Sequence, residues 1–290
     1  MKTPFLVLAA LSAALARADE APPQPVRSSL DLAVQRDGQH GQSAAASVRL
    51  PVAAGAWVQA GAGQSRRREA DSGLTYRPVQ AALGAGVAGG RWQAGVNASQ
   101  RRDGRALRQT DVAVTAEWKP TDAVTVGVDA AHRRGRASVA AGGGGASPVE
   151  QRLRGRGAGV HAAVALTPRL SVYAATMRSH YTVSTTQAGS DGGLLAGLPL
   201  LPRRVSAVNR DEAALDRSHQ LGATWRVNDR VALNGEAMKD RLHDGGNLSS
   251  LQLKAAIAAG GGWTVAPGIG RSRGPQGSTN YGLLGASYAW

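Results

Sequence analysis

Three places in the chain bring together side chains that could do hydrolytic chemistry. Such a site needs a nucleophile or an activated water beside a base, together with a group that orients the base. A histidine near a single loop carboxylate is more often simply solvated, so we expect no catalytic residues here. The three groupings are His180 with Ser184, Asp216 with His219, and Asp240 with His243 and Asp244.

The residue types also argue against metal chemistry. The chain has six histidines, which are scattered, and no cysteine. Structural zinc sites need closely spaced Cys and His ligands, and a chain without cysteine forms no disulfide. We therefore expect no metal and no cofactor.

The first residues are typical of a secretory signal peptide. Lys2 supplies the positive start, residues 4–15 are largely apolar, and Ala16-Arg17-Ala18 is a small-x-small cleavage site. Cleavage after Ala18 leaves 290 − 18 = 272 residues. We expect residues 1–18 to be the signal, 19–27 a short periplasmic segment, and 28–290 one domain.

The composition of that domain suits neither a water-soluble core nor membrane helices. Phe occurs once, aromatic residues make up 4%, and there are 38 glycines. After the signal no run of about 18 apolar residues occurs, which excludes transmembrane helices. A β-barrel in lipid needs only an apolar outer face and complete backbone pairing.

Period-two alternation indicates strands with two different faces. From Asp111 to Trp118, and again after the turn Lys119 to Asp122, apolar residues alternate with polar ones. Residues 220–236 repeat the pattern around Asn228-Asp229. One face of each hairpin is suited to lipid and the other to water.

The whole chain parses into fourteen candidate strands, so we predict an all-β, transmembrane, antiparallel up-and-down barrel. Most strands have the ~9 to 11 residues that a tilted strand needs to cross a membrane. Pro78 and Pro267 weaken two of them, and counts of 12 or 16 stay open. The strands are expected at 28–36, 43–50, 56–64, 74–83, 91–100, 108–118, 123–133, 152–166, 169–178, 219–226, 231–239, 249–259, 263–270 and 280–290.

Every second connection is short, and the others are longer and basic. The short ones are residues 51–55, 84–90, 119–122, 167–168, 227–230 and 260–262. Short periplasmic turns and long outer loops are expected of a barrel, as are aromatic residues at the membrane interface. All six tryptophans lie beside a short turn or the carboxyl terminus, which predicts an interface belt of Trp57, Trp92, Trp118, Trp225, Trp263 and Trp290.

Together with these features, the ending from Tyr281 to Trp290 resembles that of bacterial outer-membrane β-barrel proteins of the porin-like superfamily. The resemblance implies an outer-membrane location with both termini periplasmic. It also implies that the last strand, with Tyr288 and Trp290, is the signal read by the barrel-assembly machinery. Some barrels of this kind are lipases, deacylases or proteases, but the spacings of the barrel phospholipase and protease motifs do not occur here.

The polar face of the strands predicts the lining of the lumen. Opposed acids and bases there would either create a field across a narrow aqueous channel or pair with one another and close it. The expected lumen residues are Arg49, Gln59, Gln93, Asn97, Asp111, Glu117, Asp129, Arg226, Asn234, Glu236 and Lys254.

Arginine clusters at the outer strand ends carry much of the positive charge. The net charge of +14 becomes +12 once Lys2 and Arg17 leave with the signal. Arginine matches phosphate bidentately, so we expect contacts with lipopolysaccharide, or else attraction of acidic solutes to the mouth. The aromatic interleaving of a nucleic-acid surface is missing. The residues concerned are Arg66, Arg67, Arg68, Arg101, Arg102, Arg133, Arg134 and Arg136.

The connection from Ser179 to Ser218 is too long to be a simple turn. We expect it to fold into the mouth and constrict the channel, or else to form a surface cap or a contact with a neighbouring barrel. Its apolar patch contains Leu194, Leu195, Leu198, Leu200 and Leu201.

Two functions are consistent with the sequence. The first is a narrow porin-like channel for small polar or acidic solutes, of which an exopolysaccharide export pore is a specific form. The second is a closed structural or surface-interaction barrel whose outer loops bind lipopolysaccharide or polysaccharide. A monomer is expected, and a barrel lipid hydrolase is the third and least favoured reading.

Overall fold

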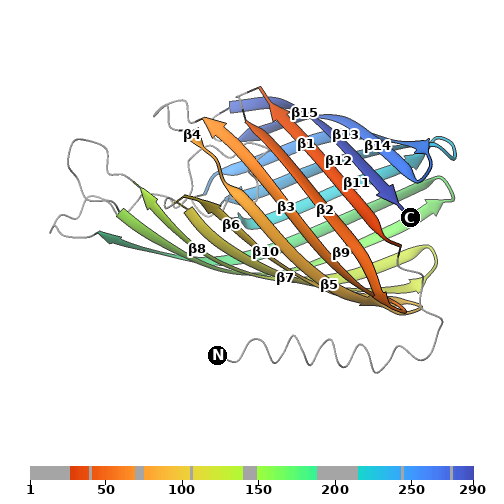
Figure 1. Cartoon of the computed structure of the whole chain (residues 1–290), viewed down its shortest axis with the longest axis horizontal. Helices are drawn as coiled ribbons and strands as arrows, with labels where there is room; N and C mark the ends of the chain where they lie inside the picture. The colour runs from red at the N-terminus through yellow and green to blue at the C-terminus, as the bar shows by residue number, and fades with distance from the viewer. Residues whose placement is uncertain are drawn as a thin grey trace.

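A computed structural model shows one closed antiparallel β-barrel (Figure 1). It describes residues 27–38, 41–68, 75–104, 107–139, 149–187, 215–242, 245–274 and 277–290. Each strand of the wall pairs with the next wall strand along the chain, and the first wall strand also pairs with the last, which closes the cylinder. Within the described residues no helix is long and apolar enough to cross a membrane.

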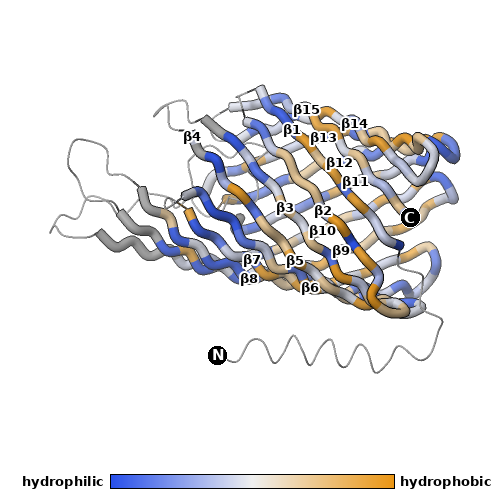
Figure 2. The backbone as a smooth tube through the Cα atoms, viewed as in Figure 1, coloured by the Kyte–Doolittle hydropathy of each residue, from blue (hydrophilic) through white to orange (hydrophobic). Residues whose placement is uncertain are grey.

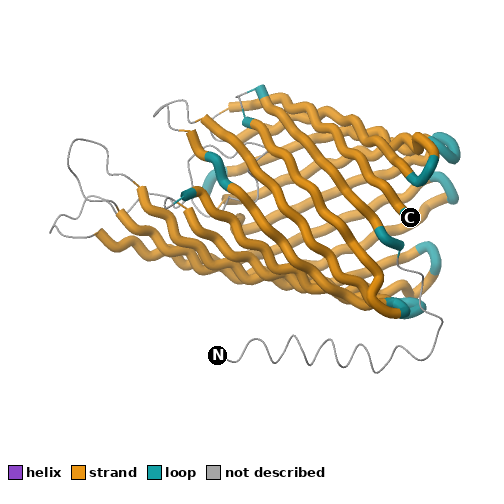
Figure 3. Tube along the Cα trace, in the orientation of Figure 1, coloured by secondary structure: helices purple, strands orange, loops and turns teal. Residues whose placement is uncertain are grey.

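Fourteen strands form the wall, and a two-residue strand, β4 (Thr75–Tyr76), pairs beside the end of β3. Figure 3 shows strands over nearly all of the described chain. The wall strands are β1 (Ser29–Asp37), β2 (Gln42–Ala53), β3 (Ala56–Arg68), β5 (Val79–Ala88), β6 (Trp92–Asp103), β7 (Leu107–Thr121), β8 (Val124–Val139), β9 (Val149–Thr167), β10 (Leu170–Gln187), β11 (Leu215–Arg226), β12 (Val231–Leu242), β13 (Asn247–Gly260), β14 (Trp263–Gly274) and β15 (Gly277–Ala289).

The fourteen predicted strands are confirmed, and most are longer than expected at the end away from the short turns. β8, β9 and β10 have 16, 19 and 18 residues. β10 pairs directly with β11, so no additional wall strand lies between them. The sixteen-strand alternative is therefore wrong for the barrel wall, as is the twelve-strand alternative.

The two proline-containing strands behave differently. β5 begins at Val79, just after Pro78, and runs to Ala88, so the turn predicted at 84–90 is wrong and only 89–91 connect β5 to β6. β14 continues through Pro267, which pairs with Leu284 of β15. On its other side, toward β13, Lys254 pairs with Gly268 and the next pair is Ile257 with Val265. The pairing thus skips Pro267, as expected because proline cannot donate a ladder hydrogen bond.

Alternation and register give the wall an inner and an outer face. The outer face carries aliphatic side chains that are largely exposed, such as Leu83, Leu221 and Ile269 at 67%, 62% and 68%. Figure 2 shows hydrophobic residues in the part of the wall nearer the carboxyl terminus and hydrophilic residues toward the opposite strand ends. An exposed apolar band of this kind is the outer surface of a barrel in lipid.

The tight turn between β13 and β14 depends on glycine. Gly260, Gly261 and Gly262 all have positive φ, of 88°, 58° and 85°. This left-handed conformation is adopted by glycine at no steric cost. The turn therefore brings Trp263 back against Gly260, and the register then shifts between Gly260 and Ala258.

Candidate lumen and membrane-facing surfaces

The eleven residues expected in the lumen all fall on the inner face. Arg49 pairs with Ser29 and Gln59, Glu117 with Gln93, and Glu236 with Gln252, each pair pointing to the same side of the sheet. Every second residue along a strand shares a face, so the remaining positions follow from these pairs. The alternation in the sequence is thus sufficient to place a residue inside or outside, but not to choose its contacts.

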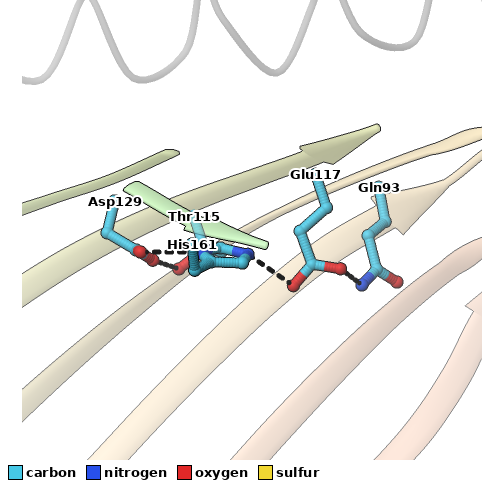
Figure 4. A network of polar contacts seen from close by, with 5 residues as sticks. All are labelled: Gln93, Thr115, Glu117, Asp129 and His161. Carbon is cyan, nitrogen blue, oxygen red and sulfur yellow. Dashed lines mark hydrogen bonds and ion pairs between the residues drawn. The ribbon is translucent and has the colours of Figure 1, made fainter. Parts of the chain in front are cut away.

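The most connected cluster on the inner wall surrounds His161 of β9 (Figure 4). Its Nδ1 lies 2.7 Å from Asp129 Oδ2 on β8, and its Nε2 lies 3.3 Å from Glu117 Oε1 on β7. Thr115 Oγ1 donates to Asp129 Oδ1 at 2.9 Å, and Gln93 Nε2 donates to Glu117. Glycine at 127, between Glu117 and His161 in the register, leaves room for the imidazole ring.

His161 was missed by the sequence analysis. Its neighbours on the inner face of β9 are Gly159 and Ala163, so no polar alternation marks its strand there. The partners come from β7 and β8, and only the register between three strands brings them together. No local sequence signal could have found this cluster.

A second cluster crosses from β10 to β15. Tyr173 donates its hydroxyl hydrogen to Glu236, and Gln252 Nε2 donates to the other carboxylate oxygen at 3.2 Å. Tyr281 OH lies 3.4 Å from Gln252 Oε1. Gly222 and Gly270 lie under the rings of Tyr173 and Tyr281, so the two rings lie flat along the wall.

Two of the arginines expected to meet lipid point into the barrel instead. Arg133 Nε lies 2.6 Å from Asp111 Oδ1, and Arg101 Nη2 donates to Gln80 Oε1 at 3.1 Å. Arg133 lies four residues after Asp129, so alternation places both on the inner face. The expectation for Arg101 and Arg133 is therefore wrong.

The other predicted arginines divide into two groups. Arg66, Arg102, Arg134 and Arg136 lie on the outer face and are exposed. The side chains of Arg67 and Arg68 lie outside the described residues, although their backbone belongs to β3.

The outer face holds more basic residues than the sequence analysis named. On β9, alternate positions are arginine at 152, 154 and 156, and the register places Arg154 opposite Arg134. The repeat of arginine at every second position was the signal that could have revealed them. The basic residues on the outer face are Arg36, Arg66, Arg102, Arg108, Arg134, Arg136, Arg152, Arg154, Arg156, Arg178, Arg217, Lys239, Arg241, Arg271 and Arg273. We call this set the outer basic ring.

Trp57 does not belong to the expected interface belt. The Arg49 guanidinium lies 4.5 Å from the centroid of its ring, and the ring covers Gly84 and Gly86 on the inner face of β5. Trp57 lies two residues before Gln59 and shares its face, so its assignment to the outer belt is wrong.

The other tryptophans occupy the outer side of the wall at the short-turn end. Trp92 and Trp118 are paired across β6 and β7. The rings of Trp263 and Trp290 flank Tyr288, with centroid distances of 4.9 and 5.4 Å. Trp225 is paired with Leu170 and is half exposed.

The lumen contains space for water. Asp31, Gln93, Asn97 and Ala113 point inward and are nevertheless exposed. A cavity of about 1880 Å³ is lined by strands from both ends of the chain, including the inward-facing Gln35, Ser43, Gln252, Lys254 and Tyr281.

Of the three groupings considered for catalysis, only Asp216 with His219 lies wholly within the described residues. His180 and His219 lie on the outer face, where His219 Nδ1 is 3.0 Å from Thr176 Oγ1. Asp240 lies on the inner face, and its side chain is buried. The Ser184 side chain, His243 and Asp244 lie outside the described residues, as does the leucine patch 194–201. Among the residues that are described, no group of acids and histidines could hold a metal.

The comparisons with known proteins identify the fold. No protein-family model and no curated protein sequence matches the chain. Among solved structures, the CymD monoaromatic hydrocarbon channel has a TM-score of 0.57 at 10% identity, covering 91% of this chain and 88% of its own. OmpT of Vibrio cholerae has a TM-score of 0.52 at 9% identity, covering 91% of this chain and 96% of its own. The Pseudomonas putida toluene transporter TodX has a TM-score of 0.51 at 11% identity, covering 94% of this chain and 93% of its own. The chain thus has the fold of bacterial outer-membrane β-barrels.

Proposed function

We propose that the protein is a channel in the bacterial outer membrane that passes small polar solutes through its lumen. One observation carries the proposal: polar side chains face the interior and are reached by water, while the outer face at the same height is apolar. A barrel filled by its own side chains would bury these inward groups. Similar solved structures that are named as channels and transporters support the same reading at the level of the fold.

The arrangement of charges suits a channel that orients polar solutes. Glu117 and Asp129 lie on β7 and β8, whereas Arg49 and Lys254 lie on β2 and β13. Acids and bases held on different sectors of a narrow pore create a field across it. The expectation of acidic solutes rested on the arginine clusters at the outer strand ends, and four of these arginines lie on the outer face of the wall.

The orientation follows from the two ends of the apolar band. The short turns, the outer-face tryptophans and the carboxyl terminus lie at one end, which we assign to the periplasm together with the amino terminus. The outer basic ring lies at the other end. Tyr288 and Trp290 at the end of β15 are the proposed recognition signal for the barrel-assembly machinery.

A second role is favoured by the outer basic ring. Arginines at the edge of an apolar band lie where the phosphates of lipopolysaccharide are expected, and guanidinium groups bind phosphate bidentately. We propose that the ring anchors the barrel in the outer leaflet. This anchoring role is compatible with a channel. If the protein carries no ionic current across a bilayer, anchoring becomes the main function.

Planar-bilayer recording of the refolded mature protein tests the proposal. We expect stepwise insertion events followed by a steady current, because inward-facing polar side chains are exposed along the lumen. A folded barrel that inserts but carries no current would contradict the proposed channel function. The anchoring role in the outer leaflet would then remain. Heat-modifiable migration on gels, which reports an intact barrel, is the control for folding.

A further inference from the structure

The carboxylates of the wall lie on one face, whereas its basic groups lie on both. Among side chains that the structure describes and that lie in regular register, every charged group on the outer face is basic. The carboxylates are on the inner face: Asp31, Asp37, Asp103, Asp111, Glu117, Asp129, Glu236 and Asp240. The basic groups there are Arg49, Arg101, Arg133, Arg226 and Lys254.

This described inner wall is therefore net acidic, although the chain carries a formal charge of +14. Five basic groups against eight carboxylates give 5 − 8 = −3 with His161 neutral. The excess positive charge lies on the other side of the wall, at the rim of the apolar band. Exposed charges there are screened over about 8 to 10 Å by salt.

In the middle of the wall the arginines are already engaged. Arg133 forms an ion pair with Asp111, and Arg49 lies over the ring of Trp57 and donates to Gln59 Oε1 at 3.1 Å. The charge of Arg133 is offset by Asp111, whereas Arg49 keeps its full positive charge between two neutral partners. Arg133 therefore contributes little to attracting anions, and Arg49 must be counted among the free positive charges of the inner wall.

The carboxylates of the middle wall are less neutralised. Glu117 and Asp129 share one imidazole, that of His161, which carries at most a single positive charge. Glu236 is held by the neutral groups of Tyr173 and Gln252. The side chains of Glu117 and Asp129 are 23% and 33% exposed, so water and ions reach them.

We infer that the lumen selects cations, both inorganic ions and small cationic organic solutes, over anions. The inference rests on the proposed channel function and names its solute class. Acidic side chains that line a narrow water-filled path attract cations, because the low-dielectric wall focuses their field along the pore. Lys254 and Arg49 offset two of the three middle carboxylates, so with His161 neutral the local balance stays negative.

The test is the reversal potential of the refolded mature protein under a steep KCl gradient in a planar bilayer. We expect the sign for K⁺ permeation. Combining Glu117→Gln, Asp129→Asn and Glu236→Gln should move the potential toward zero or reverse its sign. Arg154→Gln with Arg156→Gln is the matched control: it removes two charges from the outer face and should leave the potential unchanged.

Asp31→Asn is a second lumen variant, which keeps the test valid if the triple variant misfolds. Asp31 is exposed and accepts only a 3.2 Å hydrogen bond from Ser29 Oγ, so its loss should preserve the fold and shift the potential less, in the same direction. An anion-selective wild-type current would overturn the inference while leaving the channel intact. An unchanged potential in both lumen variants would overturn the assignment to these carboxylates. Absence of any current contradicts the channel itself.

Discussion

At the scale of single residues, the face on which a side chain lies decides its role. Trp57 and Trp118 are both tryptophans beside short turns, yet Trp57 stacks under an arginine inside the barrel and Trp118 is 55% exposed on the outer face. The two therefore differ in surroundings although the local sequence signals look alike. Fluorescence can distinguish them directly.

We predict that Trp57 is shielded from lipid and accessible from water. In a variant that retains Trp57 and replaces the other tryptophans by Phe, brominated lipid should leave the emission nearly unchanged. A variant that retains only Trp118 should be quenched strongly, and it serves as the matched control. Equal quenching of both variants would contradict the inner position of Trp57.

At the scale of strands, tyrosine rings on one strand lie across glycines on the next. Tyr173 of β10 covers Gly222 of β11, and a Cβ at Gly222 would overlap the ring. Tyr181 covers Gly155 in the same way and belongs to a buried cluster with Ala137 and Leu153. Such pairs fix neighbouring strands relative to one another, and the cluster packs the inner side of the long ends of β8 to β10.

We predict that Gly222→Ala destabilises the barrel by about 1 to 3 kcal/mol, the usual cost of overpacking a filled site. Urea unfolding of the protein refolded in lipid vesicles should show a lower midpoint. Gly235→Ala on β12 is the control, because nothing lies within 4 Å of a Cβ there and the position faces lipid. A midpoint unchanged in Gly222→Ala would show that the tyrosine moves aside freely.

At the scale of the whole molecule, one end of the apolar band is aromatic and the other is basic. In the outer basic ring arginines face one another across strands, as Arg134 faces Arg154 and Arg108 faces Arg136. Like charges directly opposite are unfavourable in a sheet unless an anion lies between them. Phosphorylated lipid in the outer leaflet would supply that anion.

We predict that Arg154→Gln with Arg156→Gln weakens binding of lipopolysaccharide to the refolded barrel by roughly tenfold, because each exposed ion pair contributes up to about 1 kcal/mol. Binding in detergent at increasing salt measures the effect, and salt should weaken the wild type more than the variant. Arg49→Gln, which removes one lumen arginine, should bind like the wild type. A loss of equal size in Arg49→Gln would argue for a general charge effect instead of a lipid site.

The sequence by itself determined the barrel, its fourteen strands and the inner or outer face of most residues. These depend on alternation and on turns, which are properties of a few consecutive residues. It even contained the correct face of Trp57 and Arg133, since each lies an even number of residues from a polar lumen position. Those two errors came from weighing residue type above alternation.

Only the tertiary structure decided which inner residues meet. His161 contacts acids from two other strands, and Glu236 contacts groups from β10 and β13, because the register around a closed cylinder sets those neighbours. Register depends on all the strand pairs together, and no short stretch of sequence encodes it. The confinement of the described wall carboxylates to the inner face likewise became visible only once every strand had its place in the wall.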